Sequence, residues 1–151
     1  MAIAHGVGGR YKRPVSRLSV VGSLPVPVPP EEAWASWSRV DDWPRWDWMG
    51  SASARWLEGE PWAPGSRLRV GHRPFAFDCL VMESRPPETV TWASRGAGLD
   101  TMHTWRFLAH PEGCLVEMSE EFDGRGARLI RPLVRWFWGR QLRAFRRHVA
   151  G

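Results

Sequence analysis

The C-terminal segment restricts the fold more than any other part of this chain. Residues 128–148 repeat at helical spacing, and one face is apolar apart from a glutamine: Ile130, Val134, Phe137, Gln141 and Phe145. The opposite face carries arginines, namely Arg128, Arg135, Arg143 and Arg146. An amphipathic helix of this length spans roughly 32 Å at ~1.5 Å per residue, about the length of a ten-residue strand. One such helix can therefore cover the concave face of a curved sheet.

Most of the preceding chain consists of short segments that alternate between apolar and polar residues. We expect strands at 54–58, 66–72, 75–85, 88–95, 101–109 and 114–123, separated by turns rich in proline and glycine. Another strand is expected over 16–28, where Pro25 and Pro27 remove two backbone donors from one edge. The short links between consecutive strands favour an antiparallel meander.

A tryptophan-rich stretch, PPEEAWASWSRVDDWPRWDWMG at 29–50, follows the first predicted strand. Pro30 suits the first turn of a helix, and Asp41 or Asp42 suits the N-cap of a second, shorter one. The stretch contains five indoles: Trp34, Trp37, Trp43, Trp46 and Trp48. Two interpretations stay open. Either all five fill the core, or Trp46 and Trp48 form the wall of a pocket.

Composition limits the classes of function. The 151 residues are 43% hydrophobic and 25% charged, which predicts one folded domain over 15–151 after a flexible arm at 1–14. The net charge of +5 comes almost entirely from arginine, yet no nucleic-acid-binding motif accompanies it, so we expect no nucleic-acid partner. Without a signal peptide or membrane span, the expected location is cytoplasmic. Contact between the arginine-rich helix and a membrane surface stays open, as does the oligomeric state.

Motifs for metal, redox or nucleotide chemistry are missing from the sequence. Cys79 and Cys114 form no CxxC pair, and each lies in an apolar run that suits a buried, reduced thiol. The five histidines are scattered without the spacing of metal ligands, and no glycine-rich phosphate-binding loop is present. We therefore expect neither a metal nor a cofactor.

Three stretches resemble a known family. They are VPVPPEEAWASWSRVDDWPRW at 26–46, PPETVTW at 86–92 and MHTWRFLAHPEGCLVEMSEEF at 102–122. They are similar to the polyketide cyclase/dehydrase and lipid-transport (SRPBCC) superfamily, which includes the START lipid-transfer domains and the major birch-pollen allergen. The resemblance covers residues 16–149. It implies an α+β helix-grip fold: a seven-stranded antiparallel sheet wraps the long C-terminal helix and leaves a hydrophobic cavity, with two short helices after the first strand.

Strand alternation then predicts which side chains face that cavity. The inward polar groups are expected to be His72, His103, Glu120 and Gln141. The complete predicted ligand-binding set is Trp46, Trp48, His72, Phe77, Val81, Trp92, His103, Trp105, Val116, Met118, Glu120, Phe137 and Gln141.

His103 and Glu120 are the candidates for chemistry. If Ala109 pairs with Cys114 across the turn at 110–113, residue 103 lies opposite residue 120. The pair could orient a polar group of a ligand or act as acid and base. Ring-forming cyclases of the family present an arginine and usually a tyrosine, but FDCLVM at 77–82 has no arginine, and Tyr11 lies outside the matched region.

The favoured function is therefore a binding or carrier protein for a small hydrophobic, ring-containing molecule. Two alternatives stay open. One is a cofactor-independent cyclase or dehydratase that uses the His103–Glu120 pair. The other is a protein-interaction module whose core is filled.

Overall fold

The computed structural model describes residues 18–96, 99–123 and 126–151, so the predicted arm at 1–14 lies outside the described residues. Seven strands form one sheet: β1 (Leu18–Val26), β2 (Ala52–Glu58), β3 (Arg67–His72), β4 (Phe77–Arg85), β5 (Thr89–Gly96), β6 (Leu99–His110) and β7 (Gly113–Asp123). The helices are α1 (Pro30–Trp37), the 3-10 turn η1 (Val40–Asp42), α2 (Trp43–Trp46) and α3 (Ala127–Val149). The predicted α+β helix-grip architecture is confirmed.

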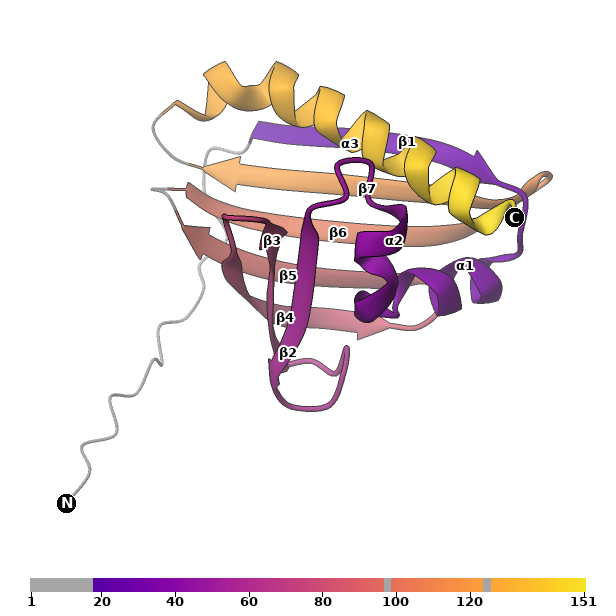
Figure 1. Cartoon of the computed structure of the whole chain (residues 1–151), viewed down its shortest axis with the longest axis horizontal. Coiled ribbons are helices and arrows are strands. Elements are labelled where there is room, and N and C mark those ends of the chain that lie inside the picture. The colour runs from indigo at the N-terminus through magenta and orange to yellow at the C-terminus, as the bar shows by residue number, and fades with distance from the viewer. Residues whose placement is uncertain (1–17, 97–98, 124–125) are drawn as a thin grey trace.

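The sheet is antiparallel throughout, in the order β1-β7-β6-β5-β4-β3-β2. The chain therefore runs as a meander from β2 to β7, and β1 joins the far edge beside β7 (Figure 1). Strand β4 begins at Phe77, two residues later than expected. The amide of Phe75 donates to the carbonyl of His72, so residues 73–76 make a turn before the strand starts.

The short helices follow the predicted order, with one difference at the second. Pro30 is the first residue of α1, where its missing N–H removes no helical hydrogen bond. Asp42 precedes α2 but makes no side-chain cap. Its carboxylate instead accepts a hydrogen bond from Arg39 Nε (2.8 Å) and pairs with Arg45 (2.8 Å). The hydrogen bond from Arg39 lowers the pKa of this carboxyl below its usual value.

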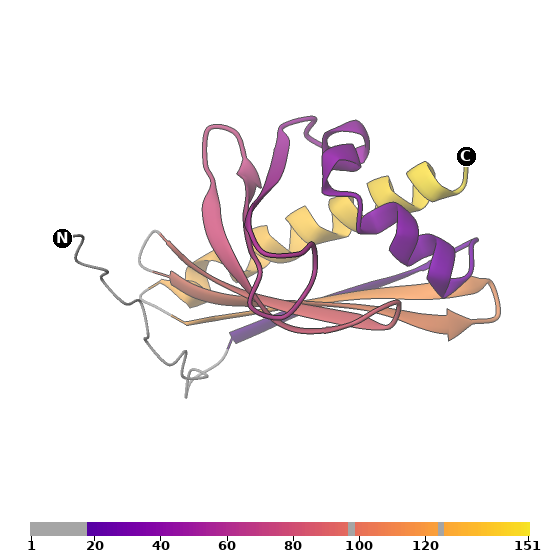
Figure 2. The same ribbon diagram turned by 90° about the horizontal axis from the view of Figure 1, so that it is seen from below.

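Helix α3 crosses the concave side of the sheet, on the side that also holds α1 and α2 (Figures 1 and 2). A Cβ at Gly22 of β1 would lie 3.0 Å from Leu142 Cδ1, so this glycine lets helix and strand approach closely. The first half of α3 packs Ile130 and Val134 against Val20 and Phe122. The second half joins the main core.

The main core is built around Trp37 of α1, whose side chain is fully buried. Its ring centroid lies 4.7 Å from that of Trp62, 5.2 Å from that of Trp105 and 5.5 Å from that of Phe107. Two indole N–H groups hold the end of α1 in place. Trp43 Nε1 donates to Trp37 O (2.6 Å), and Trp62 Nε1 donates to Ser38 O (2.8 Å). The tryptophan-rich segment thus contributes buried core residues as well as side chains that are only partly buried.

Candidate functional site

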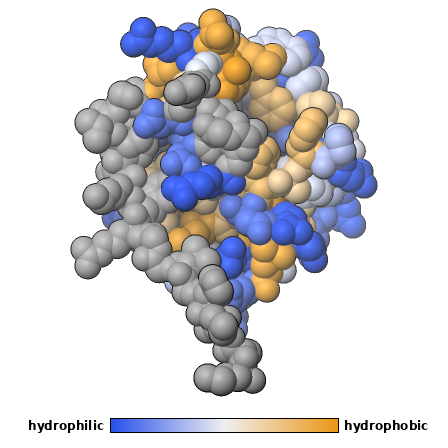
Figure 3. All heavy atoms as spheres, turned by 90° about the vertical axis from the view of Figure 1, so that its left-hand side faces the viewer, coloured by the Kyte–Doolittle hydropathy of each residue, from blue (hydrophilic) through white to orange (hydrophobic). Residues whose placement is uncertain are grey.

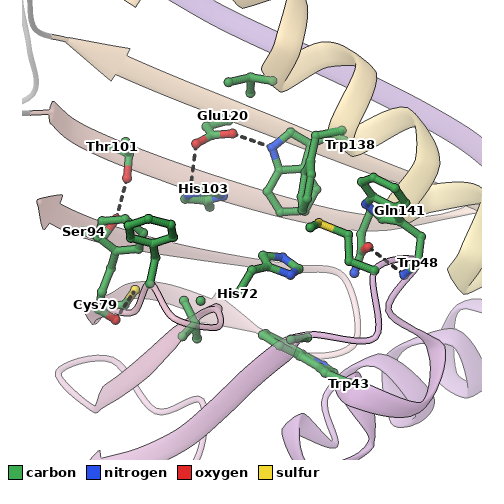
Figure 4. A pocket seen from close by; sticks show the side chains of 18 of the residues that line it. Trp43, Trp48, His72, Cys79, Ser94, Thr101, His103, Glu120, Trp138 and Gln141 are labelled. Atoms are coloured by element: carbon green, nitrogen blue, oxygen red, sulfur yellow. Dashed lines mark hydrogen bonds and ion pairs between the residues drawn. The ribbon is translucent and has the colours of Figure 1, made fainter. Parts of the chain in front are cut away.

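A cavity of about 790 Å³ lies between the sheet and α3. This volume falls in the range of ordinary small-molecule sites. Aromatic side chains dominate its walls: Trp37, Trp43, Trp46, Trp48, Phe75, Phe77, Trp92, Trp105, Trp136, Phe137 and Trp138. Only a few polar side chains interrupt this lining, and they are His72, Ser94, Thr101, His103, Glu120 and Gln141 (Figure 4).

Apolar side chains that reach solvent mark the mouth of the cavity. Met49, Phe75, Leu133 and Trp136 all line the cavity, and each is about half or more exposed. They come from the loop after α2, the β3–β4 turn and the first half of α3. Figure 3 shows the end of the molecule where α3 begins, with apolar groups interspersed among hydrophilic ones. The cavity therefore opens through an apolar rim.

The predicted His103–Glu120 pair is present on the cavity wall. Strands β6 and β7 place the two residues directly opposite each other, and His103 Nε2 lies 3.3 Å from Glu120 Oε1. The other carboxylate oxygen, Oε2, accepts a hydrogen bond from Trp138 Nε1 of α3 at 2.5 Å (Figure 4). The imidazole also stacks on Trp92, with ring centroids 5.4 Å apart and planes 10° apart. A ligand therefore meets a carboxylate already fixed in position by two protein groups.

The other polar side chains of the lining are also engaged with the protein. The hydroxyls of Ser94 and Thr101 bond to each other across β5 and β6 at 2.5 Å. Gln141 is buried, and its Oε1 accepts from the backbone N–H of Trp48 at 3.5 Å. These contacts satisfy polar groups within a mostly apolar wall.

Three residues of the predicted binding set do not line the cavity. Val81, Val116 and Met118 face inward as expected, but all three are buried in the protein core. Val116 pairs with Phe107, whose ring centroid lies 5.6 Å from that of Trp34 of α1, and Met118 pairs with Gly22, where Leu142 of α3 packs closely. Alternation identifies the inward face, yet it cannot tell which inward residues a helix covers.

The other predicted residues all lie on the cavity wall, including Trp46, Trp48 and Phe137. Sequence reasoning missed several further wall residues, of which Trp138 matters most because it holds Glu120. A signal for Trp138 was present, since it lies four residues after Val134 and three before Gln141 on the apolar face of the helix.

The cavity also contains a thiol, but not a reactive one. Cys79 is buried and free, and burial raises its pKa to about 12. Cys114, likewise free and buried, has a pKa raised by burial to about 11. Both findings confirm the expectation of buried, reduced thiols. Near neutral pH neither sulfur is a thiolate, so the cavity offers no cysteine nucleophile.

Neither a metal site nor a membrane-spanning helix is found among the described residues. Within 18–96, 99–123 and 126–151, no group of three or more histidine, cysteine or acidic side chains is placed to hold a metal ion. In the same part of the chain, no helix is both long and apolar enough to cross a membrane.

Comparison with known proteins now connects this architecture to a family. The family model described as polyketide cyclase/dehydrase and lipid transport matches residues 17–150. The chain belongs to this family. The match extends from the start of β1 to the end of α3, so it includes every element that forms the cavity. A search of functionally curated proteins found no match.

Solved structures share the fold at low sequence identity. Protein MLL2253 from Mesorhizobium loti is 18% identical with a TM-score of 0.74, and the match covers 88% of this chain and 97% of that one. Ara h 8.0201 is 15% identical with a TM-score of 0.71, covering 89% and 99%. DynU16, from the dynemicin biosynthetic locus, is 17% identical with a TM-score of 0.73, covering 87% of this chain and 47% of that one. These similarities show the fold alone.

Proposed function

We propose that the protein binds and carries a small, largely apolar, ring-containing molecule in the cavity between the sheet and α3. The supporting observation is the cavity itself, about 790 Å³ in volume and lined mainly by indole and phenyl rings. Flat aromatic walls favour flat ligands, because ring contacts add stacking energy to the burial of apolar area. A cavity of this size weighs against the alternative of a filled core that serves only protein interaction.

Calorimetric titration with 2-naphthol tests this proposal. The wild-type protein is expected to bind it, and Val70→Trp is expected to abolish binding because the larger ring occupies the cavity that Val70 lines. Leu80→Trp is the matched control, since Leu80 of β4 is 38% exposed and does not line the cavity. Unchanged affinity in the Val70→Trp variant would place the binding site elsewhere. Native mass spectrometry of protein from its own host would then identify the natural ligand.

The His103–Glu120 pair orients a polar group of the ligand in this proposal. The carboxylate is already bound to the imidazole and to Trp138, which favours a fixed acceptor over a base that must take up a proton. The alternative is a cyclase or dehydratase in which the pair acts as acid and base. Its supporting observation is that both side chains face the cavity.

A Glu120→Gln exchange separates the two roles. It keeps the shape and one acceptor oxygen but removes the charge. For a carrier we expect affinity for 2-naphthol to fall roughly 5- to 10-fold, because the glutamine oxygen still accepts a hydrogen bond but lacks the extra strength, about 1 kcal/mol, of a bond to a charged group. Loss of turnover of an aromatic substrate, with its affinity intact, would favour the enzyme.

We also infer that the mouth approaches an anionic membrane surface. Helix α3 contains seven arginines and no acidic residue, and its first half exposes Leu129, Leu133 and Trp136 beside Arg131 and Arg135. Exposed apolar groups flanked by arginines suit the boundary between lipid headgroups and acyl chains. An apolar ligand could then enter the cavity without crossing water.

Co-sedimentation with vesicles tests this inference. Vesicles of phosphatidylcholine with 30% phosphatidylglycerol should retain the protein, and retention should fall with rising salt. The double variant Arg131→Glu with Arg135→Glu should lose most of this binding. A matched double variant, Arg55→Glu with Arg67→Glu, changes the net charge equally on strands away from α3 and should lose less. If both double variants lost vesicle binding equally, the binding would depend on net charge alone and not on the arginines of α3.

A further inference from the structure

A second histidine–carboxylate pair borders the cavity, at the start of the loop after α2. Asp47 directly follows α2, and its side chain is fully buried. Its Oδ2 accepts hydrogen bonds from the backbone N–H groups of Ser51 (2.8 Å) and Ala52 (2.9 Å). The carboxylate thus fixes the loop that leads into β2 in one conformation.

The same carboxylate positions His72 at the end of β3. His72 Nδ1 lies 3.5 Å from Asp47 Oδ2 and 3.3 Å from Ser51 Oγ. A carboxylate can only accept, so it favours the tautomer with the proton on Nδ1 and leaves Nε2 as an acceptor. Phe137 packs edge-to-face against the imidazole, with ring centroids 4.9 Å apart, and this contact limits its rotation.

Nε2 of His72 is the atom that remains for a ligand. Across residues 18–96, 99–123 and 126–151 this nitrogen has no hydrogen-bond partner in the protein. The side chain is 29% exposed, so a ligand can reach it. Figure 4 shows His72 and His103 reaching into the same cavity from β3 and β6. The cavity therefore has two polar contact points on different strands.

Both contact points accept hydrogen bonds. Glu120 contributes carboxylate oxygens, each with a lone pair beyond those used by His103 and Trp138, and His72 contributes Nε2. Strands β6, β5 and β4 lie between Glu120 on β7 and His72 on β3, which places their two strands about 19 Å apart along the sheet. Side chains of α3 connect the two points more directly, because the ring centroid of Phe137 lies 4.9 Å from that of His72 and 5.2 Å from that of Trp138, whose N–H donates to Glu120. The wall between them consists of Trp92 and Cys79 and is apolar in character.

We propose that the ligand is a flat ring compound with two hydroxyl groups, one donating to Glu120 and the other to His72 Nε2, which Asp47 holds in place. This inference rests on the proposed carrier function and specifies its ligand class. Two acceptors separated by an apolar wall select two donors separated by an apolar body. A ligand with one hydroxyl would leave one of the acceptors unpaired.

Calorimetry with matched pairs of compounds tests the proposal on the full chain. The pairs are 2-naphthol with naphthalene-2,6-diol, and anthracen-2-ol with anthracene-2,6-diol, which differ in the spacing of the hydroxyls. At least one diol should bind about 5- to 10-fold more tightly than its mono-ol. In His72→Phe this ratio should fall below about twofold, because the ring shape stays while the acceptor is lost. The control His110→Phe, at the end of β6 and outside the cavity lining, should keep the wild-type ratio.

The outcomes separate the two proposals. If none of the four compounds binds the wild-type protein, the carrier function itself is wrong. If mono-ols bind but neither diol gains, or if the gain survives in His72→Phe, only the two-hydroxyl ligand is wrong. Should His72→Phe fail to fold, nitrogen-15 spectra of the wild-type histidines decide instead. The Nε2 signal of His72 must then shift with the preferred diol and not with its mono-ol.

Discussion

Two phenylalanines on one face of α3 offer a direct test of where the core ends and the cavity begins. Phe145 is fully buried, and its ring centroid lies 5.1 Å from that of Trp46. Phe137 is half-buried on the cavity wall, beside His72, Trp48 and Trp138. The same substitution at both positions should therefore have different consequences.

Phe145→Ala should be strongly destabilising. Removing a phenyl ring from a close-packed core loses its transfer free energy and leaves a void, which together cost about 3–5 kcal/mol. At roughly 3 °C per kcal/mol for a chain of this length, the melting temperature should fall by about 10–15 °C. Phe137→Ala removes a ring that already borders open space, so no new void forms. Its cost should be about 1 kcal/mol, or half the transfer value of a buried ring.

Affinity should show the reverse order. Phe137→Ala removes a ring from the wall and should weaken binding of 2-naphthol about tenfold, whereas folded Phe145→Ala should bind almost as well as wild type. Urea denaturation and calorimetry measure the two quantities independently. If Phe137→Ala were as destabilising as Phe145→Ala, Phe137 would be a core residue and the cavity would be closed at this point.

Two further predictions follow from buried groups and close contacts. Burial raises the pKa of Cys79 to about 12 and that of Cys114 to about 11, so their thiolates form only at high pH. Ellman's reagent at pH 8 should therefore label neither cysteine until denaturant is added. Rapid labelling of the native protein would show that the thiols are not buried. A Cβ on Gly71 would lie 2.1 Å from Phe75 O, so Gly71→Ala should cost about 1–3 kcal/mol of unfolding free energy in urea. Gly139→Ala is the matched control: its Cβ meets only Arg143 at 3.7 Å, and it should stabilise α3 by about 0.5–1 kcal/mol. Equal effects of the two glycine substitutions would refute the tight packing of the β3–β4 turn.

Local patterns were enough to predict the fold and part of the cavity wall. The hairpin between β6 and β7 has a short turn, and in an antiparallel pair a short turn fixes the register. Counting across it placed His103 opposite Glu120, as the structure has it. The apolar face of α3 was likewise readable, because residues three and four apart lie on one side of a helix.

Other features depended on how elements far apart in the sequence meet. Val81, Val116 and Met118 belong to the inward face that alternation predicts, but they are core residues because other elements cover them. Asp47 has no recognisable motif, and its role emerges only because the end of β3 brings His72 beside the loop after α2. The sequence alone assigned no role to Trp138, because its hydrogen bond to Glu120 depends on where α3 lies across β7.

The sequence by itself determined the order of the elements, the register of the hairpin that carries the acid–histidine pair, and the amphipathic length of the last helix. Each of these depends on neighbours within a few residues or across one turn, and backbone geometry fixes their spacing. Only the tertiary structure decided which inward residues line a cavity, which tryptophans become core, and which carboxylate meets which histidine. Those outcomes depend on where α1 and α3 rest on the curved sheet, and packing between distant segments sets that position.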